Sequence, residues 1–322
     1  MKEPLISIVI PCYNCAALVD ETLESLVTQT FRDFEVVCVN DGSKDNTAEK
    51  LERWRAKELF PMQIVHQENG GVSRARNAGI ATARGKYILF LDADDCYHRE
   101  FVDRVYRALC ESGADVSYCM LSRNEDSVKN AVIAGKEWFV LQQQPAFMSN
   151  LLYRMADFGF YCYLYKADVL RDNGILFDVN TRHFEDREFN WKYLCHCQTA
   201  AYVDAPLYWY RVNVNSVTQN KNSTWKTEDL NAVIRVEEYL QQHDCSFYSE
   251  LKSYLFARVI WGKAMRYAVG KRKDLFEKLQ EEYAVKACMK RTAKDNNKLV
   301  ALASRCYLIH PSLFYHIVRL KK

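Results

Sequence analysis

Short apolar runs alternate with amphipathic segments along the N-terminal third of the chain, and this alternation limits the possible folds more than any other feature. The amphipathic segments lie at 17–30, after the 40–46 loop and at 72–83. The apolar runs are typical of buried strands, and they are "LISIVIP" (5–11), "FEVVCV" (34–39), "QIVH" (63–66) and "YILFL" (87–91). This βαβαβαβ order predicts an α/β fold with a Rossmann-like, mostly parallel sheet and helices on both faces.

The rest of the chain is less regular up to about residue 224 and wholly helical beyond it. We expect a helix over 98–113, a strand over 114–121, a strand and a helix over 160–174, a helix over 185–194, and two short strands around Pro206. Gly174 is placed to end the helix before it. The chain therefore divides into a sheet domain of residues 1–222 and a helical C-terminal region of residues 223–322.

The 12 cysteines among the 322 residues follow no disulfide framework. Cys12 with Cys15 and Cys195 with Cys197 could pair as metal ligands, but no second pair lies at zinc-site spacing. Reduced cysteines in a cytosolic protein are the simpler interpretation. The N-terminal apolar run is too short for a signal peptide, and no apolar run of about 18 residues predicts a transmembrane helix.

Positive charge is concentrated at the C-terminus. Residues 286–322 contain nine Lys or Arg and one acid, Asp295, whereas the whole chain carries only +3, so the preceding residues sum to about −5. A basic tail on a slightly acidic body favours an anionic partner. Residues 299–322 also mix apolar side chains with basic ones, which is typical of segments that lie on an anionic membrane surface.

Two other interpretations of this basic tail stay open. Pro311 should divide it into two short helices, and such a pair could pack on the sheet domain instead of a membrane. Nucleic acid would also suit the charge, but no recognisable nucleic-acid motif accompanies it, so we expect no nucleic-acid partner.

Polar clusters follow three of the predicted strands. They are "PCYN" (11–14), "NDGS" (40–43) and "DADD" (92–95). Ligands bind beyond the carboxyl ends of parallel strands, so these clusters should converge in one cleft. Asp92, Asp94 and Asp95 would raise one another's pKa there, and a divalent cation removes that penalty. Mn²⁺ or Mg²⁺ takes few protein carboxylates and leaves its other positions to phosphates, so the cluster predicts a phosphorylated ligand.

The alternative for the acidic cluster is an exposed loop that caps the helix from residue 98, but this accounts for Asp95 alone. No G-x-G-x-x-G follows the first strand and no G-x-x-x-x-G-K-[ST] occurs, which argues against a dehydrogenase or a P-loop enzyme.

The motifs together resemble the family-two inverting glycosyltransferases of the glycosyltransferase A fold. The matching stretches are "SIVIPCYN", "VNDGSKDNT", "ENGGVSRARNAGIATARGKYILFLDADD" and a later "FED". The resemblance covers about residues 4–212 and is loose beyond. It implies transfer from a nucleoside diphosphate sugar, with UDP favoured, to a glycan or lipid-linked glycan in bacterial surface polysaccharide synthesis. It also implies a donor half of about 1–118, an acceptor half of about 119–222, and a cytoplasmic enzyme that can lie peripherally on the inner membrane face.

The resemblance also implies residue roles on the donor side. Asp41 would read the base of the donor nucleotide, with Tyr13 and Pro11 shaping the base pocket. Arg76 would meet the diphosphate, unless it is only a surface charge. Asp92 would contact the ribose, Asp94 would bind Mn²⁺ or Mg²⁺, and Asp95 would support them or cap a helix.

On the acceptor side the resemblance makes Asp186 the general base, because a sugar hydroxyl must lose its proton as it attacks. The alternative is that Glu185 and Asp186 merely favour a helix N-terminus. Arg211 could touch diphosphate or pair with a nearby acid, and His183 has no assigned role. The aromatic residues of 158–165 could stack an acceptor sugar or belong to the core.

Two competing functions are a nucleotidyltransferase and a non-catalytic sugar-nucleotide sensor. The first usually carries a Gly-rich, basic loop near its first strand, which this sequence lacks. The second needs no base, whereas Asp94 and Asp186 are both present.

Overall fold

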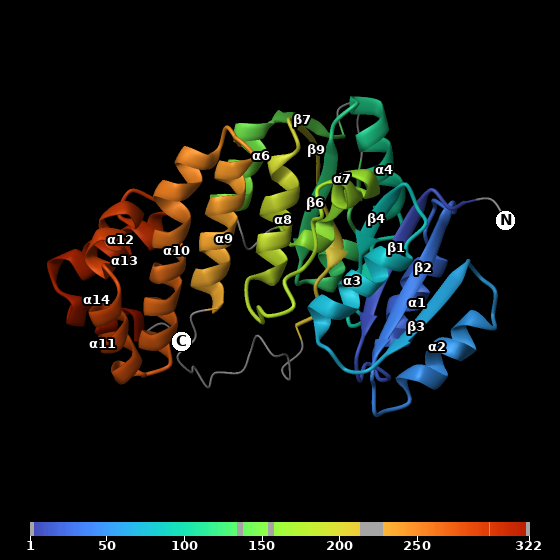
Figure 1. Ribbon diagram of the computed structural model, residues 1–322, viewed down its shortest axis with the longest axis horizontal. Coiled ribbons are helices and arrows are strands. Elements are labelled where there is room, and N and C mark those ends of the chain that lie inside the picture. Colours follow the sequence, from blue (N-terminus) through green and yellow to red (C-terminus); the bar gives the residue numbers. More distant parts are fainter. Residues whose placement is uncertain (1–2, 134–137, 154–157, 213–227, 296, 320–322) are drawn as a thin grey trace. The chain divides into compact units, whose positions relative to one another are not determined.

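The computed structural model describes residues 3–133, 138–153, 158–212, 228–295 and 297–319 (Figure 1). The chain forms two compact units. Unit one consists of residues 1–148 and 154–212, and unit two consists of residues 149–153 and 213–322. The predicted boundary near residue 222 lies outside the described residues.

A single sheet organises unit one, in the order β3-β2-β1-β4-β8-β6-β9-β5, with β7 on β9. The pairs β1–β2, β2–β3 and β1–β4 are parallel, so the predicted parallel sheet is confirmed at this side. Beyond it β8 joins antiparallel to both β4 and β6. The strands are β1 (Ile6–Cys12), β2 (Phe34–Asp41), β3 (Met62–Gln67), β4 (Tyr87–Phe90), β5 (Cys96–Tyr97), β6 (Val116–Ser122), β7 (Val140–Gln143), β8 (Tyr163–Lys166) and β9 (Thr199–Trp209).

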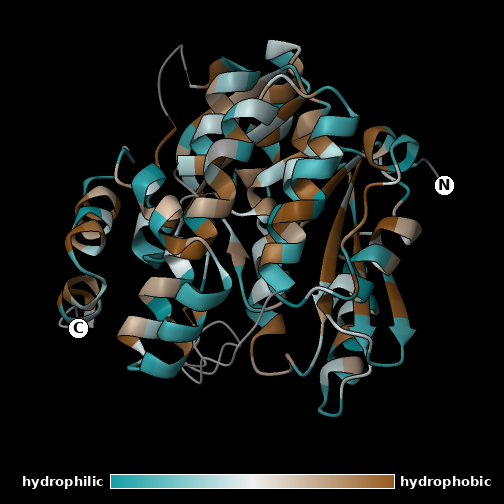
Figure 2. Cartoon of the chain, turned by 60° about the vertical axis from the view of Figure 1, so that its left-hand side comes forward, coloured by the Kyte–Doolittle hydropathy of each residue, from teal (hydrophilic) through white to brown (hydrophobic). Residues whose placement is uncertain are grey.

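The central strands are covered on both faces. Every residue of β2 is buried, and so is every residue of β1 except Pro11. Because successive side chains point to opposite faces, such continuous burial requires cover on each side. Figure 2 shows these strands largely hydrophobic and the helices mixed. The helices of unit one include α1 (Val19–Val27), α2 (Thr47–Arg55), α3 (Val72–Thr82), α4 (Phe101–Ser112), α5 (Glu125–Lys129), α7 (Ala167–Asp172) and α8 (Glu185–Cys195).

Pro206 does not divide two strands, as the sequence predicted, because β9 is continuous from Thr199 to Trp209. The register against β6 shifts at this point, where Cys119 faces Val203 and the next residue, Met120, faces Pro206. Proline is tolerated inside a sheet at such an irregularity, since no ladder hydrogen bond is then required of its nitrogen.

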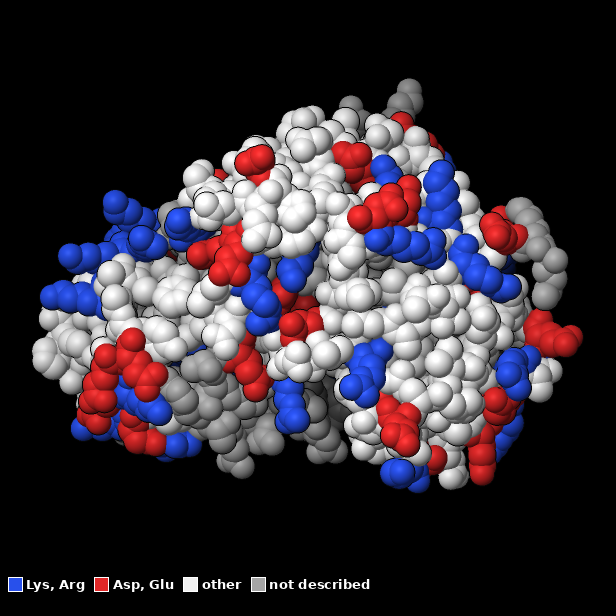
Figure 3. Space-filling view, in the orientation of Figure 1, with Lys and Arg blue, Asp and Glu red and all other residues white. Residues whose placement is uncertain are grey.

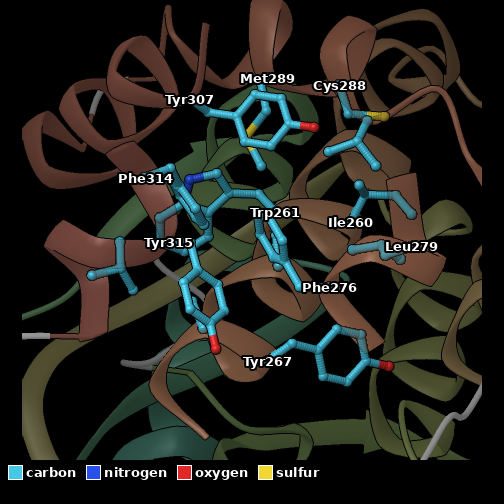
Figure 4. Packing of buried hydrophobic residues seen from close by; sticks show 14 of the residues in the cluster. Ile260, Trp261, Tyr267, Phe276, Leu279, Cys288, Met289, Tyr307, Phe314 and Tyr315 are labelled. Atoms are coloured by element: carbon cyan, nitrogen blue, oxygen red, sulfur yellow. The ribbon is translucent and has the colours of Figure 1, made fainter. Parts of the chain in front are cut away.

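Unit two is helical, as predicted, and has its own core (Figure 4). Side chains of α10, α11, α12, α13 and α14 converge there, among them Trp261, Phe276, Met289, Tyr307 and Phe314. Pro311 is the first residue of α14, so the predicted division of the basic tail into two helices is confirmed. The helices are α9 (Glu228–Gln242), α10 (Tyr248–Val269), α11 (Lys273–Glu282), α12 (Val285–Thr292), α13 (Lys298–Ile309) and α14 (Pro311–Arg319), while α6 (Gln144–Tyr153) runs from unit one into unit two. In the described part of the chain, no helix combines the length and apolar character needed to cross a membrane.

Candidate active site

The loops after β1 and β2 are joined by hydrogen bonds, as their positions at one sheet edge predicted. The Asn14 side-chain oxygen accepts from the Lys44 amide at 2.7 Å, and the Asn14 amide donates to the Ser43 hydroxyl at 3.1 Å. The Cys15 amide donates to the Thr47 hydroxyl at 2.9 Å. These bonds hold "PCYN" against the start of α2 and leave the Tyr13 ring 51% exposed.

Asp41 lies inside a strand, although the sequence placed it in the 40–46 loop. It is the last residue of β2 and is 2% exposed. Its carboxylate accepts hydrogen bonds from the Gln67 side chain at 2.6 Å and from the Gly70 and Gly71 amides at 2.8 Å each. Asp41 therefore fixes the loop that leads into α3.

Two glycines allow this loop to close on β2. Gly71 precedes α3 with a φ of 87°, in the left-handed region that favours glycine. Gly42 has a φ of 68°, and a β-carbon there would lie 2.7 Å from the Asn69 nitrogen. The loop leads directly into α3, which carries Arg76 and packs on β1 and β2.

Arg76 connects the acids after β4 with the acids of α8. Its guanidinium donates to the Asp92 carboxylate at 2.9 Å and lies 3.7 Å from a Glu185 carboxylate oxygen. The residue is only 5% exposed. Burial alone would lower the pKa of Arg76, but Asp92, Glu185 and Asp186 raise it, so the guanidinium stays charged. The structure thus brings "DADD" and "FED" together around one buried cation.

Aromatic rings enclose this cation. The guanidinium carbon of Arg76 lies 4.4 Å from the centre of the Phe160 ring and 5.2 Å from that of Phe177. Asn77 holds Phe177 by exchanging two hydrogen bonds with its backbone, at 2.8 and 2.9 Å. The sequence predicted none of these contacts of Phe160, Phe177 or Asn77, because their partners are remote in the chain.

The acidic pair opens α8 after a strained residue. Phe184 has a φ of 82°, which is unusual for a bulky side chain and is a form of strain found at functional sites. Burial and the adjacent Asp186 charge raise the pKa of Glu185 to about 7. Asp186 is partly exposed, and its carboxylate accepts a local bond from the Arg187 amide at 2.8 Å.

Asp94 is suited to a divalent cation. Burial and the nearby Asp92 charge raise the pKa of Asp94, so its ionised form lacks full compensation in the protein alone. Across the part of the chain that the structure describes, no three His, Cys, Asp or Glu side chains are arranged to hold a metal. Mg²⁺ and Mn²⁺ typically take only one or two protein carboxylates and leave their other positions to phosphates, so Asp94 has the chemistry that such an ion needs.

Asp95 does not cap a helix, which was the alternative for the acidic cluster. The residue before α4 is Glu100, and its side chain makes no capping bond. Asp95 is 1% exposed and accepts from the Tyr208 hydroxyl at 2.7 Å and the Arg211 amide at 2.8 Å. Burial and the Asp92 charge raise the pKa of Asp95 to about 8. It ties the end of β9 to the acidic loop.

Arg211 pairs with an acid, which was one of its two predicted roles. Its guanidinium contacts the Glu21 carboxylate and lies 4.6 Å from the Trp209 ring centre. In the 158–165 segment Phe158, Tyr163 and Tyr165 are buried core residues. Tyr161 is partly exposed and stacks on Tyr208 with 4.2 Å between ring centres.

Comparison with known proteins agrees with this geometry. The family described as "Glycosyl transferase family 2" matches residues 7–174, more than half of the chain. The chain belongs to glycosyl transferase family 2. An uncharacterized glycosyltransferase of Bacillus subtilis, EpsJ, is 33% identical over 219 residues, which are 67% of this chain and 63% of EpsJ. The chain thus spans less than two thirds of the length of that relative.

Solved structures support the fold of this family 2 chain. Staphylococcus aureus TarS 1–349, crystallised with UDP-GlcNAc, superimposes with a TM-score of 0.66 at 19% identity, covering 98% of this chain and 87% of that one. The mannosyltransferase PcManGT of Pyrobaculum calidifontis, solved with GDP-Man and Mn²⁺, gives a TM-score of 0.52 at 15% identity, with 95% and 88% coverage. The predicted glycosyltransferase A fold is therefore confirmed.

Proposed function

We propose that the chain is an inverting, metal-dependent glycosyltransferase that moves a sugar from a nucleoside diphosphate sugar to a glycan or lipid-linked glycan of the bacterial surface. The observation that carries this proposal is the Arg76 contact with both Asp92 and Glu185, because it joins the acids after β4 to the acids of α8. UDP is the favoured nucleotide, and the TarS complex with UDP-GlcNAc supports this choice. We assign the donor half to about 1–118, the acceptor half to about 119–222, and the reaction to the cytoplasm.

The proposed donor-binding residues are Pro11, Tyr13, Asp41, Arg76 and Asp92. The exposed Tyr13 ring beside Pro11 offers a face on which a base can stack. A carboxylate has about four acceptor positions, so Asp41 can hold its loop and still accept the imide N–H of a uracil. Besides meeting the donor diphosphate, Arg76 also orients Asp92 and Glu185 through its contacts with both acids.

The proposed metal ligand is Asp94. When bound there, Mn²⁺ or Mg²⁺ would supply Lewis-acid stabilisation of the diphosphate leaving group. The raised pKa of Asp94 and its nearness to Asp92 support this assignment, because both leave negative charge for a cation to offset. The relative PcManGT was solved with Mn²⁺, which is consistent with the same ion here.

The proposed base is Asp186. Its carboxylate removes the proton of the acceptor hydroxyl, whose oxygen forms the new bond to the anomeric carbon. The bond between that carbon and the diphosphate oxygen breaks on the opposite face, and its electron pair leaves with the diphosphate. One displacement of this kind inverts the anomeric configuration.

Thermal unfolding with nucleoside diphosphate sugars tests the donor proposal, since a ligand that binds the native state raises Tm. We expect UDP-sugars with Mn²⁺ to raise Tm more than either component alone. Product analysis by NMR with a glycan acceptor should then show inversion. If no nucleoside diphosphate sugar raises Tm with or without Mn²⁺, the proposal is wrong.

A further inference from the structure

The last two helices of unit two carry a row of exposed aliphatic side chains. On α13, Leu299, Leu302 and Ile309 are 60%, 59% and 76% exposed, and on α14, Leu313 and Ile317 are 38% and 46% exposed. Leu302, Arg305 and Ile309 are three and four residues apart, so they lie along the same side of α13. The two helices pack on each other. We call these five residues the α13–α14 surface.

These side chains are not needed for the core. The opposite sides of the same helices bury Val300, Tyr307, Phe314, Tyr315 and Val318 against α10, α11 and α12 (Figure 4). The α13–α14 surface is therefore apolar area beyond what folding requires, in helices whose inner faces are already satisfied. Removing the whole tail would destroy that core, so point substitutions are the appropriate test.

The exposed charges around the α13–α14 surface are basic. Lys286, Lys290, Arg291, Lys298 and Arg305 are exposed. Helices α12, α13 and α14 contain no acidic residue. Asp295, between α12 and α13, has a side chain only 2% exposed and 3.7 Å from Arg258. Figure 3 shows basic side chains gathered over the part where Figure 1 labels α12 and α13, with the acidic ones nearer α11.

We infer that the α13–α14 surface docks on a lipid bilayer with anionic headgroups. Exposed aliphatic side chains enter the interface and flanking Lys and Arg meet the headgroups, which is how amphipathic helices lie on membranes. A second copy of the chain is a poorer occupant, since a symmetric contact would bring like charges together. This inference rests on the proposed function, because a lipid-linked acceptor would lie in such a bilayer. Vesicle binding can nevertheless be tested separately, since its measurement requires no sugar transfer.

The experiment uses the full chain and vesicles of phosphatidylglycerol mixed with phosphatidylcholine, compared with pure phosphatidylcholine, in a flotation assay at low and high salt. We expect binding to the anionic vesicles that weakens with salt. Leu302→Gln/Ile309→Gln and Lys298→Gln/Arg305→Gln should each weaken it roughly tenfold. The matched controls in unit one are Leu59→Gln, where the side chain is 50% exposed, and Arg53→Gln. Neither control should change vesicle binding.

Hydrogen exchange on the unaltered chain gives a second measurement that does not depend on any variant folding. Peptides of residues 298–318 should gain protection with anionic vesicles. The inference is overturned if the unaltered chain does not float, if the α13–α14 variants bind as tightly as the controls, or if those variants abolish self-association instead. If the chain transfers sugar but does not bind vesicles, the membrane-docking inference is wrong and the proposed function is unaffected. If the chain binds vesicles but does not transfer sugar, the membrane-docking inference is retained and the proposed reaction is wrong.

Discussion

The buried Arg76 guanidinium lies 2.9 Å from the partly exposed Asp92 carboxylate. Both acids that Arg76 approaches, Asp92 and Glu185, are partly buried, and removing the cation would leave them without a compensating positive charge. We therefore expect the Arg76–Asp92 pair to contribute both to the stability of the fold and to the positions of the site acids.

Arg76→Gln should lower the free energy of unfolding by up to about 3 kcal/mol, since it removes a buried cation while leaving the acids in place. Urea denaturation measures this change. The control is Arg53→Gln, which removes an exposed partner of Glu49 within α2 and should cost only about 0–1 kcal/mol. Equal effects of the two substitutions would contradict the linking role of Arg76.

Asp41→Ala should destabilise the fold as well as weaken nucleotide binding. The Gly70 and Gly71 amides would lose their shared acceptor, and a hydrogen bond of this kind contributes about 0.5–1.5 kcal/mol. Asp41→Asn retains one carbonyl oxygen and should lose less. Chemical denaturation and UDP titration separate the two effects. A variant that unfolds as the unaltered chain does would show that Asp41 serves only the ligand.

Asp94→Ala should remove the Mn²⁺ dependence of UDP binding and abolish transfer, because the proposed cation loses its protein ligand. Isothermal titration of UDP with and without Mn²⁺ measures how far the affinity for UDP depends on the ion. Asp103→Ala on α4 is a control acid away from the cluster. Tighter UDP binding with Mn²⁺ in the Asp94 variant would rule out this ligand.

Asp186→Asn should reduce the transfer rate by roughly 10²–10⁴ with donor binding retained, since the shape stays and the proton acceptor is lost. Single-turnover assays with a glycan acceptor measure the rate. Asp172→Asn, on the exposed end of α7, is the matched control. Near-normal transfer by the Asp186 variant together with an inactive Glu185→Gln would reverse the roles within the pair.

The raised pKa of Glu185 predicts a pH effect on stability. Its folded pKa of about 7 lies above the usual value of about 4.3, so the folded state holds this proton more tightly. Stability from this group is therefore present below about pH 4 and declines as pH rises towards 7. Glu185→Gln should reduce the difference in unfolding free energy measured at about pH 5 and about pH 8. An unchanged difference would place the titration elsewhere.

Much of the site could be predicted because it depends on local order. Asn14 and Ser43 follow neighbouring parallel strands, so their meeting follows from strand order alone. The predicted start of the 40–46 loop was wrong, since β2 continues to Asp41 where it pairs with β3. The continuity of β9 through Pro206 was also missed, because a register shift belongs to the pairing with β6 and not to the strand itself.

The sequence alone determined the alternation of buried strands and helices, the acids at the strand ends and the division of the basic tail at Pro311, because each follows from residue types and spacing along a short segment. Only the tertiary structure decided which side chains of different segments contact one another. Asn77 and Phe177 are 100 residues apart in the chain, yet they hold the aromatic ring over Arg76. Such contacts arise when the chain closes long loops around a core, and no pattern within either segment encodes the partner.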